Sequence, residues 1–425
     1  MKKWYALYSN ILYLHFSEKY YSLPESAKNA SSPQNPINRL IRVGGYTIMR
    51  LIGNLFQSVE KPEKLEGNVW LYVVSQNNLD SLQFVRQNLP GSVFVAGQSK
   101  NIGRYQKEVE RLSLRRKLLY YYKLPSLLYQ FLRKKPKSAI RFFDLLYDAV
   151  GFYEVYYRKL QRYSPSAIIF ANDHNADARA MLLAAKDLGI KTIYIQHASV
   201  SSLFPPLSYD LNLLEGQDSL DKYKQCGPIP GRVELVGMPK ADKYIPYRNT
   251  SKHISTIGIG CNLMDDLGEI EKMLRLLSQK LPDIKLILRP HPRDTRNIAA
   301  LARVAPNVYL SDSRSEPVFE YLRQLDVQIS GTSGIHLEAV LLNVWSIYYD
   351  FSPSEKLNDY YGFVRHGLVD VAESAEGLID NLRLHINSKP DVVGRAKYYS
   401  ATLCTADEGH SGDISISHIS SFLNS

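Results

Sequence analysis

Between residues 68 and 350, short apolar runs alternate with longer segments in which apolar residues recur every three or four positions. The short runs are typical of buried strands, and the longer segments are typical of helices. Strands that alternate with helices pair in parallel and carry helices on both faces, so the pattern predicts an α/β fold. The predicted strands are 69–74, 92–96, 167–170, 192–195, 211–214, 233–236, 255–260, 284–288, 308–310, 327–329 and 345–349.

The polar, proline-containing segment 242–252 separates this region into two blocks of similar size. Each block has the strand and helix order of a Rossmann-like domain. We therefore predict two successive Rossmann-like domains with parallel sheets and an N-terminal helical extension. The predicted divisions are an amphipathic extension 1–66, an N-terminal domain 67–245 with a basic helical insertion 100–163, a C-terminal domain 246–400, and a tail 401–425 that packs back on the N-terminal domain.

Two further stretches have an apolar stripe with helical spacing. The first stripe consists of Phe143, Leu146, Val150, Tyr153, Tyr157 and Leu160. The second, within 37–59, consists of Leu40, Ile41, Ile48, Leu51, Ile52, Leu55 and Phe56. Arg39, Arg42 and Arg50 lie off the second stripe. Each stripe fits either a core face with solvated charges around it or a face that meets a membrane.

Positive charge is concentrated in one part of the chain. The net charge is +10, and residues 100–163 hold 16 Lys or Arg against 5 Asp or Glu, together with 10 of the 30 tyrosines. Basic amphipathic helices with tyrosines suit the anionic surface of a bilayer. Phosphate backbones attract the same cations, but no nucleic-acid-binding motif accompanies the patch, so we expect no nucleic-acid partner.

The N-terminus contains an uncharged run, 4–17, that loosely resembles a signal peptide. Ser9, Asn10 and His15 interrupt this run, and no small-residue cleavage site follows it. Nowhere does the chain have the roughly 20 apolar residues that a spanning helix needs. The three cysteines fit neither a disulfide framework nor a zinc site. We expect a cytoplasmic protein, peripheral on the inner membrane.

Three turns in the second block follow predicted strands and have the chemistry of a phosphate site. The turn 330–334 (SGTSG) supplies hydroxyls and glycines before a helix, and the turn 289–293 (RPHPR) supplies two arginines and a histidine that prolines hold extended. Gly258 and Gly260 would let a ligand approach the backbone closely. The alternatives are an ordinary helix cap, a structural His-Pro turn and a lone Gly-x-Gly.

Two turns in the first block could supply a general base. Asp173 and His174 follow the strand 167–170, and His197 follows the next strand, 192–195. Consecutive strands are usually neighbours, so we expect these side chains to converge in one crevice. The alternatives are that Asp173 caps the following helix and that His197 is an ordinary loop histidine. The acidic pair at 265–266 precedes a helix and is expected to favour its positive end rather than to bind a metal.

Several of these segments together resemble the GT-B group of nucleotide-sugar glycosyltransferases. The nearest likenesses are bacterial capsule synthesis proteins, CDP-glycerol glycerophosphotransferases and bacterial sialyltransferases. The resemblance covers residues 165–350 and is carried by 196–197 (QH), 236–242 (VGMPKAD), 289–292 (RPHP) and 330–338 (SGTSGIHLE). Ala198 stands where the glycerophosphotransferases carry a glycine after the histidine.

The resemblance implies two facing Rossmann-like domains, with the acceptor bound by 67–245 and the donor nucleotide by 246–400. It also implies that His291 and the hydroxyls of 330–333 hold the donor phosphate, and that Glu338 contacts ribose or sugar. Catalysis is assigned to His197, Asp173 and His174. Donor binding is assigned to Gly258, Gly260, Arg289, His291, Arg293, Ser330, Thr332, Ser333, His336 and Glu338.

The function we expect is a metal-independent glycosyltransferase that needs no cofactor. It would move a sugar from a nucleotide donor, CMP- or UDP-linked, to a bacterial glycan or lipid-linked glycan such as capsule or lipopolysaccharide. A CDP-polyol phosphotransferase, a nucleotide-sugar epimerase and a non-catalytic glycan-assembly partner remain alternatives.

Overall fold

The computed structural model describes residues 2–29, 31–56, 60–98, 102, 107–352 and 359–425. The chain divides into two compact units, which are described separately. Unit 1 comprises residues 1–236 and 412–425, and unit 2 comprises residues 237–411. Residues 237–245 therefore belong to unit 2, and the C-terminal segment 412–425 belongs to unit 1.

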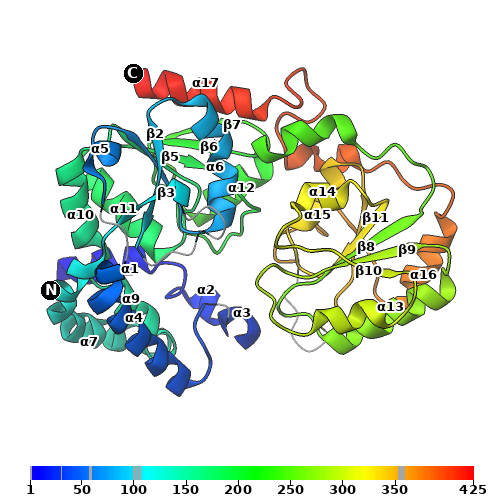
Figure 1. The fold of residues 1–425 in the computed structure, drawn as a ribbon, viewed down its shortest axis with the longest axis horizontal. Helices are drawn as coiled ribbons and strands as arrows, with labels where there is room; N and C mark the ends of the chain where they lie inside the picture. Colours follow the sequence, from blue (N-terminus) through cyan, green and yellow to red (C-terminus); the bar gives the residue numbers. More distant parts are fainter. Residues whose placement is uncertain (1, 30, 57–59, 99–101, 103–106, 353–358) are drawn as a thin grey trace. The chain divides into compact units, whose positions relative to one another are not determined.

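In the described part of unit 1, seven parallel strands form a sheet in the order β3-β2-β1-β4-β5-β6-β7 (Figure 1). The order runs outward in both directions from β1 and β4, as in a Rossmann-like sheet. The strands are β1 (Val69–Tyr72), β2 (Ser92–Gly97), β3 (Val109–Leu112), β4 (Ala167–Phe170), β5 (Lys191–Ile195), β6 (Leu211–Leu214) and β7 (Arg232–Leu235).

Helices of unit 1 cover this sheet and form the N-terminal segment. They are α1 (Lys2–Ile11), α2 (Glu18–Tyr21), α3 (Glu25–Asn29), α4 (Pro36–Phe56), α5 (Pro62–Leu65), α6 (Gln76–Asn88), η2 (Arg115–Lys123), α7 (Leu124–Lys134), α8 (Pro136–Arg141), α9 (Phe143–Ala149), α10 (Phe152–Tyr163), α11 (Ala176–Asp187), α12 (Gln217–Cys226) and α17 (Ser411–Asn424).

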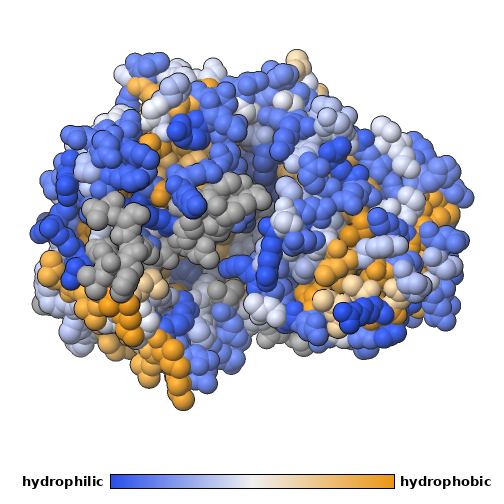
Figure 2. Space-filling view, viewed as in Figure 1, coloured by the Kyte–Doolittle hydropathy of each residue, from blue (hydrophilic) through white to orange (hydrophobic). Residues whose placement is uncertain are grey.

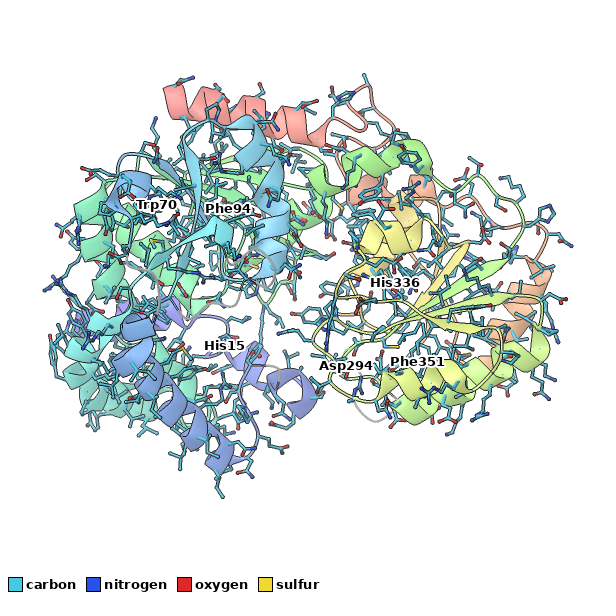
Figure 3. All side chains as sticks on the ribbon, viewed as in Figure 1. His15, Trp70, Phe94, Asp294, His336 and Phe351 are labelled. Carbon is cyan, nitrogen blue, oxygen red and sulfur yellow. The ribbon has the colours of Figure 1, made fainter. Side chains whose placement is uncertain are left out.

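Two apolar clusters form the core of unit 1. One contains Trp70, Phe170 and the N-terminal residues Tyr8 and Phe16, so the N-terminal segment is part of the core. The other contains Phe94 and Ile419 of α17 (Figure 3).

Unit 2 has a second parallel sheet, in which the described strands follow the order β10-β9-β8-β11-β12-β13. These strands are β8 (Thr256–Gly260), β9 (Lys285–Arg289), β10 (Val308–Leu310), β11 (Val327–Ser330), β12 (Trp345–Tyr348) and β13 (Asp370–Val371). The helices are η3 (Pro239–Tyr247), α13 (Leu267–Lys280), η4 (Ile298–Arg303), α14 (Val318–Leu322), α15 (Ile335–Leu341), α16 (Ala375–Leu384) and η5 (Val393–Tyr398). Their apolar faces form one core.

The basic segment 100–163 is not wholly helical where it is described. It includes β3, which pairs in parallel with β2 at the edge of the sheet. The stripe from Phe143 to Leu160 lies on two helices, α9 and α10, because Gly151 between them has a φ of +86°. Leu146 and Leu160 are fully buried, so this stripe is a core face.

The stripe on α4 lies in the opposite environment. Leu40, Ile41, Ile48 and Ile52 are exposed, whereas Arg39 and Arg50 are buried. The side chains of the predicted stripe residues 55 and 56, and residues 57–59, lie outside the described structure. Among the described helices, none is long and apolar enough to cross a membrane.

Candidate functional site

The first candidate site lies in unit 1, where β1 and β4 are neighbours. Strands on either side of this pair are added in opposite directions, and such a switch point opens a crevice at the carboxyl ends of the strands. Asn78 ties the two loops there together: its Oδ1 accepts from the N–H of Val74 at 3.2 Å, and its Nδ2 donates to the carbonyl of Ala171 at 3.3 Å. The next residues along the chain, 172–175, form the loop that holds the predicted base.

Asp173 and His174 are joined in this loop. The Asp173 carboxylate is buried and receives hydrogen bonds from His174 Nδ1 at 2.8 Å and from Tyr223 Oη at 2.6 Å. Burial favours a higher pKa for Asp173, but the hydrogen bond and charge of His174, the Tyr223 hydrogen bond and the charge of His197 together lower the pKa. Asp173 is therefore ionised at neutral pH.

An ionised carboxylate only accepts hydrogen bonds, so Nδ1 of His174 must carry the proton of the 2.8 Å bond. In the neutral ring, Nε2 is then an unprotonated acceptor. The His174 side chain is 28 % exposed and packs against Phe204, with ring centroids 4.5 Å apart. An oriented, partly accessible imidazole of this kind can act as a general base.

The loop around Asp173 is held by residues from distant parts of unit 1. Arg179 of α11 donates to the backbone carbonyl of Asp173 at 3.1 Å and to the carbonyl of Asn10 at 2.9 Å, and it also bonds the Asn10 side chain. The side-chain oxygen of Asn172 accepts from the N–H of Asn175 at 2.8 Å. These contacts fix the direction in which the His174 ring points.

His197 follows β5, which pairs directly with β4. Its ring is half-buried, and its charge contributes to lowering the pKa of Asp173, so the two side chains are near each other. The preceding Gln196 bonds Glu215 twice: Nε2 donates to Oε2 at 3.1 Å, and Oε1 accepts from the Glu215 N–H at 2.9 Å. The carboxyl edge of β4 and β5 thus carries all three predicted catalytic residues.

The second candidate site lies in unit 2, where β8 and β11 meet at the corresponding switch point. Gly260, the last residue of β8, is in register with Arg289 on one side and with Ser330 on the other. The turns 289–293 and 330–334 therefore both begin at this carboxyl edge, one strand apart. This juxtaposition is the geometry that a shared phosphate site requires.

The turn 330–334 is supported from inside the fold. Ser330 is buried and donates to the carbonyl of Gly260 at 2.9 Å. His336, also buried, bonds the carbonyl of Gly331 through Nε2 at 2.9 Å and Ser346 Oγ through Nδ1 at 2.7 Å (Figure 3). Burial lowers the pKa of His336 to about 4. His336 and Ser330 thus hold the backbone of the turn and direct their polar atoms inward.

Thr332 and Ser333 lie at the outer part of this turn and are only half-buried. Thr332 Oγ1 is 3.5 Å from Tyr348 Oη, and Ser333 Oγ accepts from the N–H of Ile335 at 3.3 Å. The helix that follows, α15, has only seven residues. For binding an anion, the hydroxyls of Thr332 and Ser333 therefore matter more than the dipole of this short helix.

Packing within the sheet requires glycine at positions 258 and 260, which the sequence pattern does not reveal. A Cβ at Gly258 would lie 2.3 Å from Tyr321 Oη, and one at Gly260 would lie 2.4 Å from Ser330 Oγ. The buried Gln328 side chain also occupies this space. Both glycines make room for a polar network within the sheet, rather than for a ligand approaching from outside.

The arginines of the turn 289–293 differ in their surroundings. Arg289 is buried, and it donates to Ser311 Oγ and to the carbonyl of Glu316, both at 2.8 Å. It also forms an ion pair with Glu316 at 3.3 Å. Arg293 is exposed. Arg289 therefore holds the loop after β10, whereas Arg293 projects from the turn.

His291 is half-buried, and its Nδ1 accepts from the N–H of Arg293 at 3.1 Å. Since Nδ1 is an acceptor, the proton of the neutral ring is on Nε2. Burial lowers the pKa of His291, and the positive charge of Arg293 lowers it further. His291 is a neutral N–H donor at neutral pH. Glu338, by contrast, is paired with Lys240 at 2.6 Å, so its carboxylate binds a residue of unit 2.

Sequence patterns did not reveal the side chains that join the turns of unit 2. Asn262 Nδ2 donates to the carbonyl of Thr332 at 3.4 Å, and Arg296 donates to the carbonyls of Asp265 and Asn262 at 2.6 and 2.9 Å. Burial raises the pKa of Asp265 to about 7. Its neighbour Asp266 caps α13 by accepting from the N–H groups of Gly268 and Glu269, the role predicted for the pair, whereas Asp265 accepts from the N–H of Asn262.

The described residues contain no group of three or more His, Cys, Asp or Glu side chains that could hold a metal ion. No protein-family model matches the sequence, and no curated protein sequence matches it either.

Solved structures do match. The UDP-GlcNAc 2-epimerase from Neisseria meningitidis, bound to UDP-GlcNAc, has a TM-score of 0.50 and 14 % identity, covering 84 % of this chain and 100 % of the other. The wall teichoic acid polymerase TagF, soaked with CDPG, has a TM-score of 0.51 and 10 % identity, covering 92 % and 98 %. The S. aureus MnaA–UDP structure has a TM-score of 0.51 and 12 % identity, covering 84 % and 97 %.

The fold is of the GT-B type. This confirms the predicted fold class. Identities of 10–14 % carry no information on which reaction this chain performs.

Within the GT-B-type fold of this chain, the N-terminal segment supplies site residues for which no local motif exists. The carbonyl of Asn10 accepts a hydrogen bond from Arg179, and His15 lies close enough to His174 for a charge on His174 to disfavour protonation of His15. Figure 3 labels His15. Burial, then His174 and Arg42, lower the pKa of His15 to about 3, so His15 is neutral. Tyr223 is likewise contributed by a helix distant in sequence. Only the folded chain shows these contributions.

Proposed function

We propose that this protein transfers a sugar from a nucleotide-activated donor to a bacterial surface glycan, without a metal ion. The observation that carries the proposal is the Asp173–His174 pair at the switch point of unit 1. A buried, ionised acid accepts a hydrogen bond from Nδ1 of a partly exposed imidazole, so in the neutral ring Nε2 is the acceptor. That arrangement fits a base that activates an acceptor hydroxyl.

In the proposed reaction, an acceptor hydroxyl oxygen attacks the anomeric carbon of the donor sugar, and the bond from that carbon to the phosphate oxygen breaks. His174 Nε2 takes the hydroxyl proton, and Asp173 stabilises the imidazolium that results. Asp173 keeps its negative charge throughout. His197, on the neighbouring strand, would take part by holding the acceptor or by serving as a second base.

The donor would bind at the carboxyl edge of unit 2. Negative charge develops on the departing phosphate, and donors fixed at that position lower the barrier. The groups available there are the hydroxyls of Thr332 and Ser333, the Nε2–H of His291 and the guanidinium of Arg293. Arg289, Ser330, His336 and Glu338 would act indirectly, because their polar atoms are bound within the fold. The UDP-GlcNAc and CDPG of two structures with a similar fold support a nucleotide-linked donor.

The proposal is tested with a panel of radiolabelled CMP-, CDP-, UDP- and GDP-linked donors and a glycan acceptor. Sugar should pass from one donor to the acceptor, and His174→Ala should reduce the rate by about 100-fold or more. His253→Ala is the matched control, since His253 is an exposed histidine of unit 2 whose side chain bonds only to Asn387 among the contacts described. Full activity of the His174→Ala variant would remove His174 as the base.

A second candidate, transfer of a polyol phosphate from a CDP-linked donor, is favoured by one observation. The wall teichoic acid polymerase TagF, whose fold resembles that of this chain, was soaked with CDPG. CDP-glycerol labelled at the β-phosphate distinguishes the two reactions, because the label enters the polymer only if phosphate is transferred. An epimerase would instead alter the sugar with no acceptor present, and a non-catalytic partner would turn over no donor at all.

A further inference from the structure

Helix α4 packs against unit 1 with its polar side inward. Its outer face is formed by apolar side chains that are 38–65 % exposed (orange band over α4 in Figure 2). They are Ile37, Leu40, Ile41, Ile48, Met49, Leu51 and Ile52. A helix on the surface of a globular protein ordinarily has the reverse orientation, with its apolar stripe in the core.

Ion pairs and hydrogen bonds fix this orientation. Arg39 donates to the carbonyls of Ile140 and Arg141, both at 2.7 Å. Arg42 pairs with Asp144 at 3.2 Å, and Arg50 pairs with Asp148 at 2.9 Å. Rotating α4 to bury its apolar stripe would expose these carboxylates and break all three arginine contacts. These contacts therefore fix the apolar face of α4 on the outside of unit 1.

Exposed apolar residues also lie on η2, α7 and α8, which contact α4 or one another. Helix α4 contacts η2, and the Arg39 bonds place it against the end of α8. The exposed apolar residues of η2, α7 and α8 are Leu119, Tyr122, Tyr129, Leu132 and Ile140. We call these residues and the outer face of α4 together the α4 surface.

Exposed cations accompany the α4 surface on η2, α7 and α8. They are Arg115, Arg116, Arg133, Lys134 and Lys137. The stretches 37–56 and 115–137 contain no Asp or Glu. A surface that combines exposed isoleucine, leucine and tyrosine with charge of one sign is complementary to an anionic lipid bilayer.

We propose that the α4 surface docks the protein on an anionic membrane, with α4 lying in the plane of the headgroups. The exposed aliphatic side chains would enter the boundary of the acyl chains, where burying their CH₂ and CH₃ groups favours binding. The flanking cations would meet the anionic headgroups. This inference stands on the α4 surface alone and does not depend on the proposed function.

Charge distinguishes a bilayer from a second copy of this chain. A two-fold interface would place the same surface on both subunits, and its cations would then face cations. An anionic membrane supplies the opposite charge, and the aliphatic residues of α4 need only reach the headgroup boundary. The membrane is thus the occupant that accounts for both the apolar residues and the cations.

Co-sedimentation with vesicles tests the proposal on the full chain. Vesicles of equal parts phosphatidylcholine and phosphatidylglycerol should bind the protein, and phosphatidylcholine alone should bind it at least about tenfold more weakly. The double variant Ile41→Glu with Ile48→Glu should bind the anionic vesicles at least about tenfold more weakly than the unchanged chain. Leu384→Glu is the matched control, because Leu384 is 74 % exposed on unit 2. This control should bind as the unchanged chain does.

Replacing Arg115 and Arg116 with Gln should weaken binding to anionic vesicles and reduce its dependence on salt, with little effect on neutral vesicles. Thermal unfolding should be unchanged in all variants, since every substituted side chain is exposed. Failure of the unchanged chain to bind vesicles would overturn the proposal, as would equal losses in the α4 and Leu384 variants. A dimer that dissociates in the Ile41→Glu, Ile48→Glu variant would show that the surface serves a second copy instead.

Discussion

Unit 1 and unit 2 each place a buried carboxylate beside the switch point of a parallel sheet, yet the two acids are held in opposite states. Hydrogen bonds and the charges of His174 and His197 outweigh the effect of burial on Asp173, and its pKa is lowered. Burial dominates at Asp265, and its pKa rises to about 7. The switch points of two similar sheets thus carry different acids: an ionised carboxylate after β4 in unit 1, and a carboxyl group that titrates near neutral pH after β8 in unit 2.

The neighbouring histidines differ in the same way. In unit 1, His174 is partly exposed and oriented by the charge on Asp173. In unit 2, His336 is buried with both ring nitrogens bonded, while His291 presents an N–H donor. Unit 1 is therefore equipped to accept a proton, and unit 2 is equipped to hold an anion. The units share an architecture, and the side chains at each carboxyl edge set the chemistry of that edge.

The largest expected effect comes from removing the charge of unit 1. Asp173→Asn should lower turnover by about 100-fold or more, because an amide does not select the ring tautomer that leaves Nε2 of His174 unprotonated. Initial rates with the active donor measure the effect, and donor KM should change little.

Thermal unfolding checks that the Asp173→Asn variant remains folded. Should it fail to fold, His174→Gln removes the base while leaving the buried acid in place, and it should show the same loss of turnover. Normal turnover in both variants would contradict the difference in role between the two units.

The corresponding change in unit 2 should affect binding. His291→Ala removes the Nε2–H donor and should raise donor KM or lower turnover by at least about tenfold. Arg293→Gln, an exposed neighbour, should raise KM by a smaller factor. Calorimetry with the nucleotide of the active donor measures the loss directly. Unchanged kinetics and affinity in both variants would show that the turn 289–293 does not contact the donor.

The architecture could be predicted because its signals are local. Runs such as 167–170 and 211–214 coincide with β4 and β6, since short apolar runs between turns are what a buried parallel strand requires. β3 was not predicted, because Glu110 and Arg111 give it the charged sequence of an edge strand. β13 has only two residues, too few to leave a pattern.

The direction in which an apolar stripe faces could not be predicted. The stripes on α9–α10 and on α4 have the same spacing, yet Leu146 and Leu160 are buried while Ile41 and Ile48 are exposed. The spacing of apolar residues shows that a helix has an apolar and a polar face. Which face is buried depends on the side chains that pack against the helix. For α4 the deciding partners are Asp144 and Asp148, which lie about 100 residues further along the chain.

The candidate site was partly predictable for the same reason. Asp173, His174, His197 and the two turns of unit 2 could be predicted as site residues because they directly follow predicted strands. Parallel strands bring their carboxyl ends to one edge of the sheet. The residues that orient these groups, such as Arg179 and Tyr223, come from other elements and belong to no motif. Their roles follow from distances and hydrogen bonds alone.

A substitution at Arg179 tests whether catalysis depends on the residues that hold the Asp173 loop in place. Arg179→Lys should lower turnover about fivefold with donor KM unchanged, because a lysine ammonium does not span both Asp173 and Asn10 as the guanidinium does. Asn10→Ala should show part of the same effect. A merely structural role would appear as a lowered unfolding temperature without a separation of turnover from KM. That result would exclude Arg179 as a positioning residue.

The smallest expected effect concerns the titrating acid of unit 2. The folded-state pKa of Asp265 lies near 7 and the unfolded value near 4, so between these pH values the folded chain holds a proton that the unfolded chain has released. The contribution of Asp265 to stability is therefore present below about pH 4 and is lost as pH rises towards 7. Asp265→Asn removes this titration, and the fall in unfolding free energy between pH 5 and pH 8 should shrink by about 1 kcal/mol or more.

Denaturant unfolding followed by Trp345 measures this change, with Trp4 and Trp70 replaced by Phe so that only unit 2 reports. The unfolding of unit 1, followed by Trp70 with Trp345 replaced by Phe, should show the opposite sign for Asp173→Asn, because a lowered pKa contributes stability above the unfolded value that is lost as pH falls. Asp265→Asn should thus flatten a decline towards alkaline pH, and Asp173→Asn should flatten a decline towards acid. The same pH dependence in the Asp265→Asn variant and the unchanged chain would mean that Asp265 is ionised like Asp173. The two sheet edges would then not differ in the charge state of their buried acids.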